Sequence, residues 1–397
     1  MTTESFRASP AYESHVSADA KFHVNSGWRR VDYFAHNSSP DYESFRPEGF
    51  EGDAWSTAVP VEHHAVRNTA GLFDFSTFGK IEVAGPGAES LLEWLCSNRI
   101  ARGVGRITYT QMLNIEGGVI GDFTVTQLAP DKFVAITNTG ALAHDLKWFA
   151  ERAGDPETPL AGPVTITDVT NGWACFGLWG PLARDILQPL VDISLATDDF
   201  PYMHSRDARI SDVAVRLSRV TFVGELGWEV YVPTGWGRWL WSRLTEAVDE
   251  AGGRRAAFMC VDSLRAEKGY LYLGDDLTAD RTPFESGLAK FVAMDKTFYG
   301  RSALEGATEP TETLQCVTVD EPNLVLRGGE PVTGVGVASK LTSGGISYTL
   351  GGAIGYVYLP TNLPTDVELT VEVDGRALPA KLALQPLYDP TGQHFRG

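Results

Sequence analysis

Residues 105–138, GRITYTQMLNIEGGVIGDFTVTQLAPDKFVAITN, contain three strand patterns separated by turns. The patterns are rich in β-branched and aromatic residues, and the Glu-Gly-Gly and Pro-Asp steps between them are typical of turns. The three strands are predicted at 107–114, 121–128 and 132–138. Consecutive strands joined by short turns pair in an antiparallel way, which favours an α+β fold over a doubly wound parallel sheet.

The flanking segments support this assignment. A strand pattern and a helix pattern precede the three strands at 79–85 and 86–99, and an amphipathic helix follows at 141–154. A second cycle with a similar order is expected at 164–170 (strand), 180–191 (helix), 213–222 and 228–233 (strands) and 236–253 (helix). The two cycles share the order of their elements but no repeated residues.

Helix patterns are not evident beyond about residue 308. Short strands with regular spacing follow, which predicts a C-terminal all-β barrel or sandwich. These strands are expected at 312–320, 330–341, 351–359, 366–375 and 378–386. The first 60 residues read as irregular, with Gly27-Trp28 and Tyr33-Phe34 as anchors on a folded body.

The composition excludes several classes of function. Lys and Arg total 33 against 51 Asp and Glu, which gives a formal net charge of −18. This excess argues against binding to nucleic acid or to an anionic membrane surface. The N-terminus is polar, and no segment approaches the roughly 20 apolar residues of a membrane span. We therefore expect a cytoplasmic protein.

Motifs for metals, phosphates and nucleophiles are missing. The four cysteines are far apart and form no Cys-x-x-Cys pair, so isolated buried thiols are expected. His63-His64 has no supporting ligand at helical spacing, and no metal site is predicted. Residues 85–90, GPGAES, lack the third glycine of a dinucleotide fingerprint.

Two carboxylates in strand patterns are candidates for chemistry. Asp122 begins an apolar, β-branched strand, where it either caps a turn or faces a pocket that raises its pKa. Glu229 lies within the strand WEVYVP, where it faces either solvent or a partner such as the N–H edge of a pterin ring. A third candidate segment follows the helix that ends at Gly269, with Tyr270 and Tyr272 beside Asp275-Asp276.

In their order along the chain, these segments resemble the aminomethyltransferase family, the T-protein of the glycine cleavage system. The matching text includes 62–88, 105–126, 218–233, 262–292, 298–304, 351–360 and 384–392. The resemblance is closer to the folate-binding C-terminal half of dimethylglycine and sarcosine dehydrogenases, which GWRRVDYFA at 27–35 resembles specifically.

The resemblance implies a three-domain cloverleaf with tetrahydrofolate held in a central channel. The implied domains are 1–76 with 166–276, 77–165 with 277–308, and the barrel 309–397. Asp122 matches the catalytic aspartate of the family and Glu229 the glutamate that binds the pterin. Further residues of the folate site are implied at Tyr109, Asn138, Tyr270 and Glu285.

Two departures bear on the chemistry. Cys260-Val261-Asp262 stands where the glycine-cleavage branch has Ala-Arg-Asp, and Phe222 replaces a family tyrosine. The missing arginine weakens the case for aminomethyl-lipoyl chemistry.

The resemblance implies a one-carbon transferase, and we expect a demethylase that moves a methyl group from a small N-, O- or S-methyl donor to tetrahydrofolate. Two alternatives remain open. One is methylene or aminomethyl transfer with a separate flavoprotein or a glycine-cleavage-type partner. The other is a non-catalytic folate-binding protein like the iron–sulfur-assembly relatives, although residues 268–275, KGYLYLGD, lack the cysteine of their motif.

Overall fold

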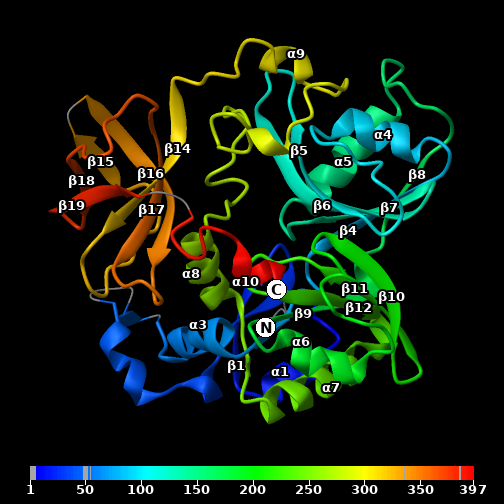
Figure 1. The fold of residues 1–397 in the computed structure, drawn as a ribbon, viewed down its shortest axis with the longest axis horizontal. Coiled ribbons are helices and arrows are strands. Elements are labelled where there is room, and N and C mark those ends of the chain that lie inside the picture. Colours follow the sequence, from blue (N-terminus) through cyan, green and yellow to red (C-terminus); the bar gives the residue numbers. More distant parts are fainter. Residues whose placement is uncertain (1–5, 48–51, 54, 335, 384–385) are drawn as a thin grey trace, which may run out of the picture.

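The computed structural model describes residues 6–47, 52–53, 55–334, 336–383 and 386–397. Its two large open sheets and a closed barrel are arranged around the helix α8 (Phe258–Lys268) and the C-terminal segment (Figure 1). This mixed helix–strand architecture confirms the predicted α+β fold with a C-terminal barrel. No helix in the described part of the chain has the length and apolarity needed to cross a membrane.

The five-stranded sheet contains the segment from which the fold was predicted. Its order is β5 (Ile107–Leu113), β6 (Val119–Ala129), β7 (Lys132–Thr137), β4 (Gly79–Ala84) and β8 (Thr165–Asp168), with every neighbouring pair antiparallel. The helices α4 (Ala88–Leu95) and α5 (Leu142–Ala153) cover one face, where Ile81, Phe123 and Phe133 form a buried core. The residues that alternate with these core positions lie on the opposite face of the sheet.

The six-stranded sheet repeats this arrangement. Its order is β10 (His204–Ile210), β11 (Val213–Arg219), β12 (Gly227–Pro233), β9 (Trp173–Trp179), β3 (Gly71–Asp74) and β13 (Arg254–Arg255). The helices α6 (Ala183–Leu187) and α7 (Gly237–Glu250) cover one face, over a core that includes Phe176, Trp228 and Trp241. The element orders β4-α4-β5-β6-β7-α5 and β9-α6-β10-β11-β12-α7 are the same, which confirms the predicted similarity between the two cycles.

The start of the second cycle was predicted wrongly. The strand expected at 164–170 is β8, and it pairs with β4 in the sheet of the first cycle. The second cycle instead begins with β9, which lies between β12 and β3. The run WACFGLW in β9 is buried along most of its length, so it lacks the polar alternation by which the other strands were found.

The N-terminal region is also more regular than expected. A helix, α1 (Tyr12–Ser17), precedes a hairpin of β1 (Ala20–Asn25) and β2 (Trp28–Phe34). Ser26 and Gly27 form its two-residue turn, with φ of 49° and 79°, and positive φ at both positions matches the twist of a hairpin. Trp28 and Phe34 are buried, so the predicted anchors are confirmed within a β-hairpin.

The remaining elements complete the fold. The barrel contains β14 (Glu312–Val319), β15 (Pro331–Gly334), β16 (Val337–Ile346), β17 (Ala353–Pro360), β18 (Leu369–Val373) and β19 (Arg376–Ala383). Residues 384 and 385 of the last predicted strand lie outside the described residues. The other α-helices are α3 (Ala58–Asn68), α9 (Arg301–Leu304) and α10 (Gln393–Arg396). Short 3₁₀ helices are found at Ala35–Asn37, Pro40–Phe45, Thr170–Gly172, Gln188–Leu190, Thr234–Trp236 and Ala289–Phe291.

The two open sheets meet at one edge. The Ile107 N–H donates to the carbonyl of Met203 at 2.9 Å, and the Ser205 N–H donates to the carbonyl of Gly105 at 2.7 Å. These bonds join the β5 edge of one sheet to the β10 edge of the other. The faces opposite α4–α5 and α6–α7 therefore face each other across a cleft, although α3 and α8 cover part of that face of the six-stranded sheet.

The guanidinium of Arg67 joins α3, α8, the loop before β12 and the C-terminal segment. It donates to Glu225 Oε1 at 2.8 Å, to Glu267 Oε2 at 3.0 Å and to the carbonyls of Val223 and Leu264. It also lies over the ring of Tyr388, 3.7 Å from the ring centroid. The charged groups of Arg67, Glu225 and Glu267 are all buried.

We predict that Arg67→Met lowers the free energy of unfolding by about 3–5 kcal/mol, because two buried carboxylates lose their cation. Denaturant unfolding followed by tryptophan fluorescence measures this change. The matched control is Arg243→Met, which removes an exposed pair with Glu246 and should leave stability nearly unchanged. A loss in Arg67→Met no larger than in the control would contradict the prediction.

Candidate functional site

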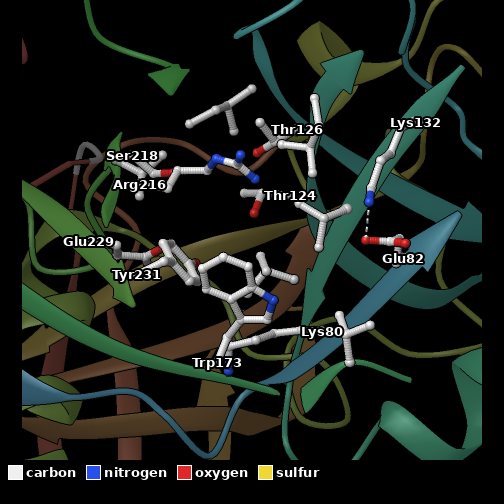
Figure 2. A pocket seen from close by; sticks show the side chains of 16 residues that line it. Lys80, Glu82, Thr124, Thr126, Lys132, Trp173, Arg216, Ser218, Glu229 and Tyr231 are labelled. Atoms are coloured by element: carbon white, nitrogen blue, oxygen red, sulfur yellow. Dashed lines mark hydrogen bonds and ion pairs between the residues drawn. The ribbon is translucent and has the colours of Figure 1, made fainter. Parts of the chain in front are cut away.

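The cleft between the two sheets holds a pocket of about 230 Å³. The five-stranded sheet contributes the side chains that alternate with its core, including Lys80, Thr124 and Thr126, and the six-stranded sheet contributes Arg216 and Glu229. Figure 2 shows these side chains converging from the two walls. The remaining lining residues are Glu82, Ile107, Leu128, Lys132, Val134, Ile136, Val169, Trp173, Ser218, Val220 and Tyr231.

Asp122 and Tyr109 lie together on adjacent strands of the cleft wall. The Tyr109 hydroxyl donates to Asp122 Oδ2 at 3.0 Å, and the ring of Tyr109 packs edge-on against Phe291. Asp122 is on the same face of β6 as Thr124 and Thr126, which line the pocket. Desolvation, with a smaller effect of Asp145, raises the pKa of Asp122 to about 6, although the Tyr109 bond partly opposes the shift.

Glu229 projects into the pocket from β12. Its Oε2 accepts a hydrogen bond from the hydroxyl of Tyr231 at 2.5 Å, and burial raises the pKa of the Glu229 carboxyl. Among the described residues no donor is bonded to Oε1. One carboxylate oxygen can therefore accept hydrogen bonds from a ligand.

The pocket also contains residues that the sequence analysis missed. Lys80 is buried and donates to the carbonyls of Ser76 at 3.1 Å and Phe78 at 2.9 Å, and desolvation lowers its pKa. Arg216 reaches toward Thr126 in Figure 2 and donates to Asp207 at 2.8 Å. Lys80 and Arg216 each alternate along the strand with core residues. A sheet face that is exposed to solvent shows the same alternation, so the pattern alone did not mark them as pocket residues.

An aromatic wall and an ion pair complete the lining. Figure 2 shows the indole of Trp173 within the pocket, near Glu229. At the other side, Lys132 Nζ pairs with Glu82 Oε2 at 2.8 Å. The pocket thus combines a flat aromatic surface with charged groups of both signs.

Of the six predicted site residues, Glu229 lines the pocket and five do not: Asp122 and Tyr109, and also Asn138, Tyr270 and Glu285. Asn138 Oδ1 accepts from the N–H of Gly140, which shapes the turn that leads to α5. Tyr270 stacks on Phe222 with ring centroids 5.7 Å apart. Glu285 accepts from the Thr282 N–H and pairs with Arg281 at 2.9 Å. Any role of Asn138, Tyr270 and Glu285 in ligand binding stays a prediction.

The thiols and histidines of the described residues have other surroundings. The four cysteines are free and buried, as expected. The ring nitrogens of His63 are hydrogen-bonded to Ser263 and Thr349, both at 2.7 Å. The rings of His63 and His64 contact each other edge-on. No group of three potential metal ligands is present among the described residues.

The arrangement supports acid–base chemistry next to a bound ring. A carboxyl group with a pKa near 6 can exchange a proton at neutral pH, and the buried Glu229 can fix the orientation of a ligand through its hydrogen bonds. The cleft also excludes water from one side of each group, which strengthens these interactions.

Comparison with known proteins identifies the family. The GCVT N-terminal domain matches residues 11–296, and the glycine cleavage T-protein C-terminal barrel domain matches residues 313–389. An aminomethyltransferase of Saccharopolyspora erythraea is 32% identical over 96% of this chain and 98% of its own length. The aminomethyltransferase T of Bartonella henselae shares the fold, with a TM-score of 0.80, 24% identity and coverage of 97% and 99% of the two chains.

Other relatives are longer than this chain. The 4-methylaminobutanoate oxidase (formaldehyde-forming) of Paenarthrobacter nicotinovorans is 31% identical over 100% of this chain and 48% of its own length. The dimethylglycine dehydrogenase of Rattus norvegicus is 32% identical over 91% of this chain and 42% of its own. The chain therefore spans less than half the length of these two relatives.

Aminomethyltransferases of this kind are transferases that use tetrahydrofolate, so the comparisons confirm the resemblance seen in the sequence and its implied cofactor. The matched domains cover most of the chain. The chain belongs to the glycine cleavage T-protein family.

Proposed function

We propose that this protein moves a one-carbon unit from a small methylated amine to tetrahydrofolate bound in the cleft between the two sheets. The observation that supports the proposal is the cleft itself, where Glu229 lines the pocket from one wall and the Asp122–Tyr109 pair lies on the face of the other wall that carries the lining residues Thr124 and Thr126. Three relatives carry names that point to N-methyl compounds: 4-methylaminobutanoate, dimethylglycine and sarcosine.

The pocket residues fit a pterin ring. The free oxygen of Glu229 can accept from the two N–H groups on one edge of the ring, an arrangement that suits a carboxylate. Trp173 offers a flat surface, and Val134, Ile136 and Val220 supply apolar walls. We therefore assign Glu229 to binding, and when bound, tetrahydrofolate supplies the nucleophilic nitrogen that accepts the one-carbon unit.

Asp122 is proposed as the catalytic carboxylate. Positive charge develops near the reacting nitrogens as a carbon–nitrogen bond forms, and a nearby carboxylate stabilises this charge or accepts the proton that leaves. The Tyr109 hydroxyl donates to Oδ2 and so orients the carboxylate while Oδ1 stays free among the described residues. Positioning of the two reactants within the cleft supplies several further kcal/mol.

The proposed reaction is transfer of an intact methyl group, which changes no oxidation state. Transfer of a methylene unit is the second candidate, and it is favoured by the dehydrogenase and oxidase relatives, which are about twice the length of this chain. That route needs a separate flavoprotein to oxidise the amine first. Formation of demethylated amine from one methylated donor and tetrahydrofolate, with no flavoprotein present, supports the first candidate, and a strict requirement for the flavoprotein supports the second.

Asp122→Asn should reduce turnover by about two orders of magnitude, because the neutral amide cannot accept a proton or stabilise a cation. Steady-state kinetics measures turnover, and calorimetry measures tetrahydrofolate affinity. The affinity should change by less than about twofold, because the amide keeps the size of the carboxylate. Turnover near that of the wild type would exclude Asp122 as the catalytic residue.

Tyr109→Phe should shift the acidic limb of the pH–rate profile to higher pH. In the wild type, activity rises as the Asp122 carboxyl with its pKa of about 6 loses its proton. The Tyr109 bond stabilises the carboxylate, so its loss raises the pKa and moves the limb upward, by about one pH unit. The control is Tyr299→Phe, because the ring of Tyr299 packs on Trp94 and not on Asp122. An unchanged or downward-shifted limb would contradict this assignment.

Glu229→Gln should weaken tetrahydrofolate binding by at least about tenfold, because a neutral amide oxygen accepts weaker hydrogen bonds from the two N–H groups than a charged carboxylate oxygen does. Anaerobic calorimetric titration measures the affinity. Glu372→Gln, at an exposed position in the barrel strand β18, is the matched control and should bind as the wild type does. Equal affinity in the two variants would remove Glu229 from the site.

A further inference from the structure

The hairpin β1–β2 places an arginine without an ion-pair partner beside the helix α8. The Arg30 guanidinium lies over the ring of Phe258, 3.4 Å from the centroid. Among the described residues no carboxylate is within the 4.0 Å that defines an ion pair with Arg30. Its Nε is buried and donates no hydrogen bond. Desolvation lowers the pKa of Arg30, although the nearby Tyr272, Asp262 and Asp32 oppose the shift.

Buried cations on α3 and α8 do have carboxylate partners. Arg265 on the same helix is buried, yet it pairs with Asp276 at 3.2 Å. Arg67 and Lys268 likewise have carboxylate partners at 3.0 Å or closer. A partly desolvated guanidinium that lacks a counter-ion is costly, and a bound carboxylate would offset that cost. Since the ring of Phe258 covers one face of the guanidinium, its N–H edge is left to donate to a planar anion.

A negative group lies next to this cation. Asp262 is one helical turn after Phe258, so both are on the same face of α8. The Tyr272 hydroxyl donates to Asp262 Oδ1 at 2.5 Å, which leaves Oδ2 without a bonded partner among the described residues. Asp262 is exposed to solvent. Arg30 and Asp262 therefore present opposite charges that are close but not paired with each other, an arrangement that suits a ligand carrying both an ammonium and a carboxylate group.

This cluster lies at the same end of the five-stranded sheet as Asp122. The ring of Phe258 contacts Phe78, which directly precedes β4. The hairpin turn at Ser26 is close to Gly140, where an added Cβ would be 3.4 Å from Ser26 Oγ. The register of β6 and β7, with Thr124 opposite Ile136, places Asp122 opposite residue 138. A ligand bound at Arg30 therefore lies at the same end of the five-stranded sheet as Asp122.

We propose that Arg30 binds the carboxylate of the one-carbon donor, with Asp262 next to its amine, so that the donor is an N-methylated amino acid. This inference rests on the proposed function and names the donor class. The glutamate carboxylate of tetrahydrofolate is a second source of the same chemical group, and the experiment separates the two.

The test compares Arg30→Met with Arg29→Met. Met keeps an apolar stem of similar length in both variants. Arg29 is the adjacent residue of β2, and its guanidinium also stacks on an aromatic ring, that of Phe6 at 4.3 Å. Calorimetric titration measures the binding of sarcosine, dimethylglycine and 4-methylaminobutanoate to each protein, and trimethylamine is the probe without a carboxylate. Unfolding midpoints equal to that of the wild type verify that both variants are folded.

The wild type should bind at least one of the three amino acids saturably and trimethylamine at least about tenfold more weakly. Arg30→Met should lose at least about tenfold in affinity for that amino acid without a change for trimethylamine, and Arg29→Met should bind it within about twofold of the wild type. Equal amino-acid affinity in Arg30→Met and wild type would overturn the proposal. The proposal would also be overturned if the wild type bound none of the three amino acids.

A second pair of titrations separates the two sources of carboxylate. Tetrahydrofolate carries the benzoylglutamate tail, and 6-methyltetrahydropterin lacks it. If Arg30→Met weakens only tetrahydrofolate binding, Arg30 binds the glutamate tail and the donor assignment is wrong. Absence of tetrahydrofolate binding by the wild type would instead contradict the proposed function, whatever the result for Arg30.

Discussion

The buried guanidinium of Arg67 is the constraint on which the centre of the molecule depends. Its partners come from α8, the loop before β12 and the C-terminal segment, and none of them can move away without leaving a buried charge unpaired. Burial alone would raise the pKa of Glu267, but His63 and Arg67 hold it well below its usual range. Ser347 and Thr349, after β16, also donate to Glu267, so the same network fixes the barrel against α8.

The cleft follows from the pairing of the two open sheets. Each sheet buries one face under helices, and part of its other face carries polar residues at alternate positions, while α3 and α8 cover the rest of that face in the six-stranded sheet. Edge-to-edge hydrogen bonds at Ile107 and Ser205 bring the two polar faces together. Residues that would be solvated on a single sheet therefore become a partly desolvated pocket, and burial there raises the pKa of Glu229. Desolvation also raises the pKa of Asp122, on the same face of β6 as the lining residues Thr124 and Thr126.

The sequence was sufficient for most of the elements and for placing Glu229 in the pocket, but not for the rest of the pocket walls. The strands 107–138 were predicted because their turns and composition are local signals, and β9 was missed because a strand that is buried along its length shows no alternation. Asp122 and Glu229 were singled out as carboxylates within otherwise apolar strands, and the family resemblance then assigned their roles, which stay predictions. Lys80 and Arg216 were missed, since only the packing of one sheet on the other distinguishes a pocket face from a solvent face. The turn position of Asn138 and the ion pair of Glu285 likewise depend on contacts that no local pattern encodes.

The proposed folate site is tested most directly by a crystal structure of the protein with tetrahydrofolate bound. We expect the pterin ring between the two sheets, with its N–H edge on Glu229 and its reactive nitrogens on the side of Asp122. Tetrahydrofolate bound elsewhere, or bound in the cleft with its ring turned away from Glu229, would contradict this expectation.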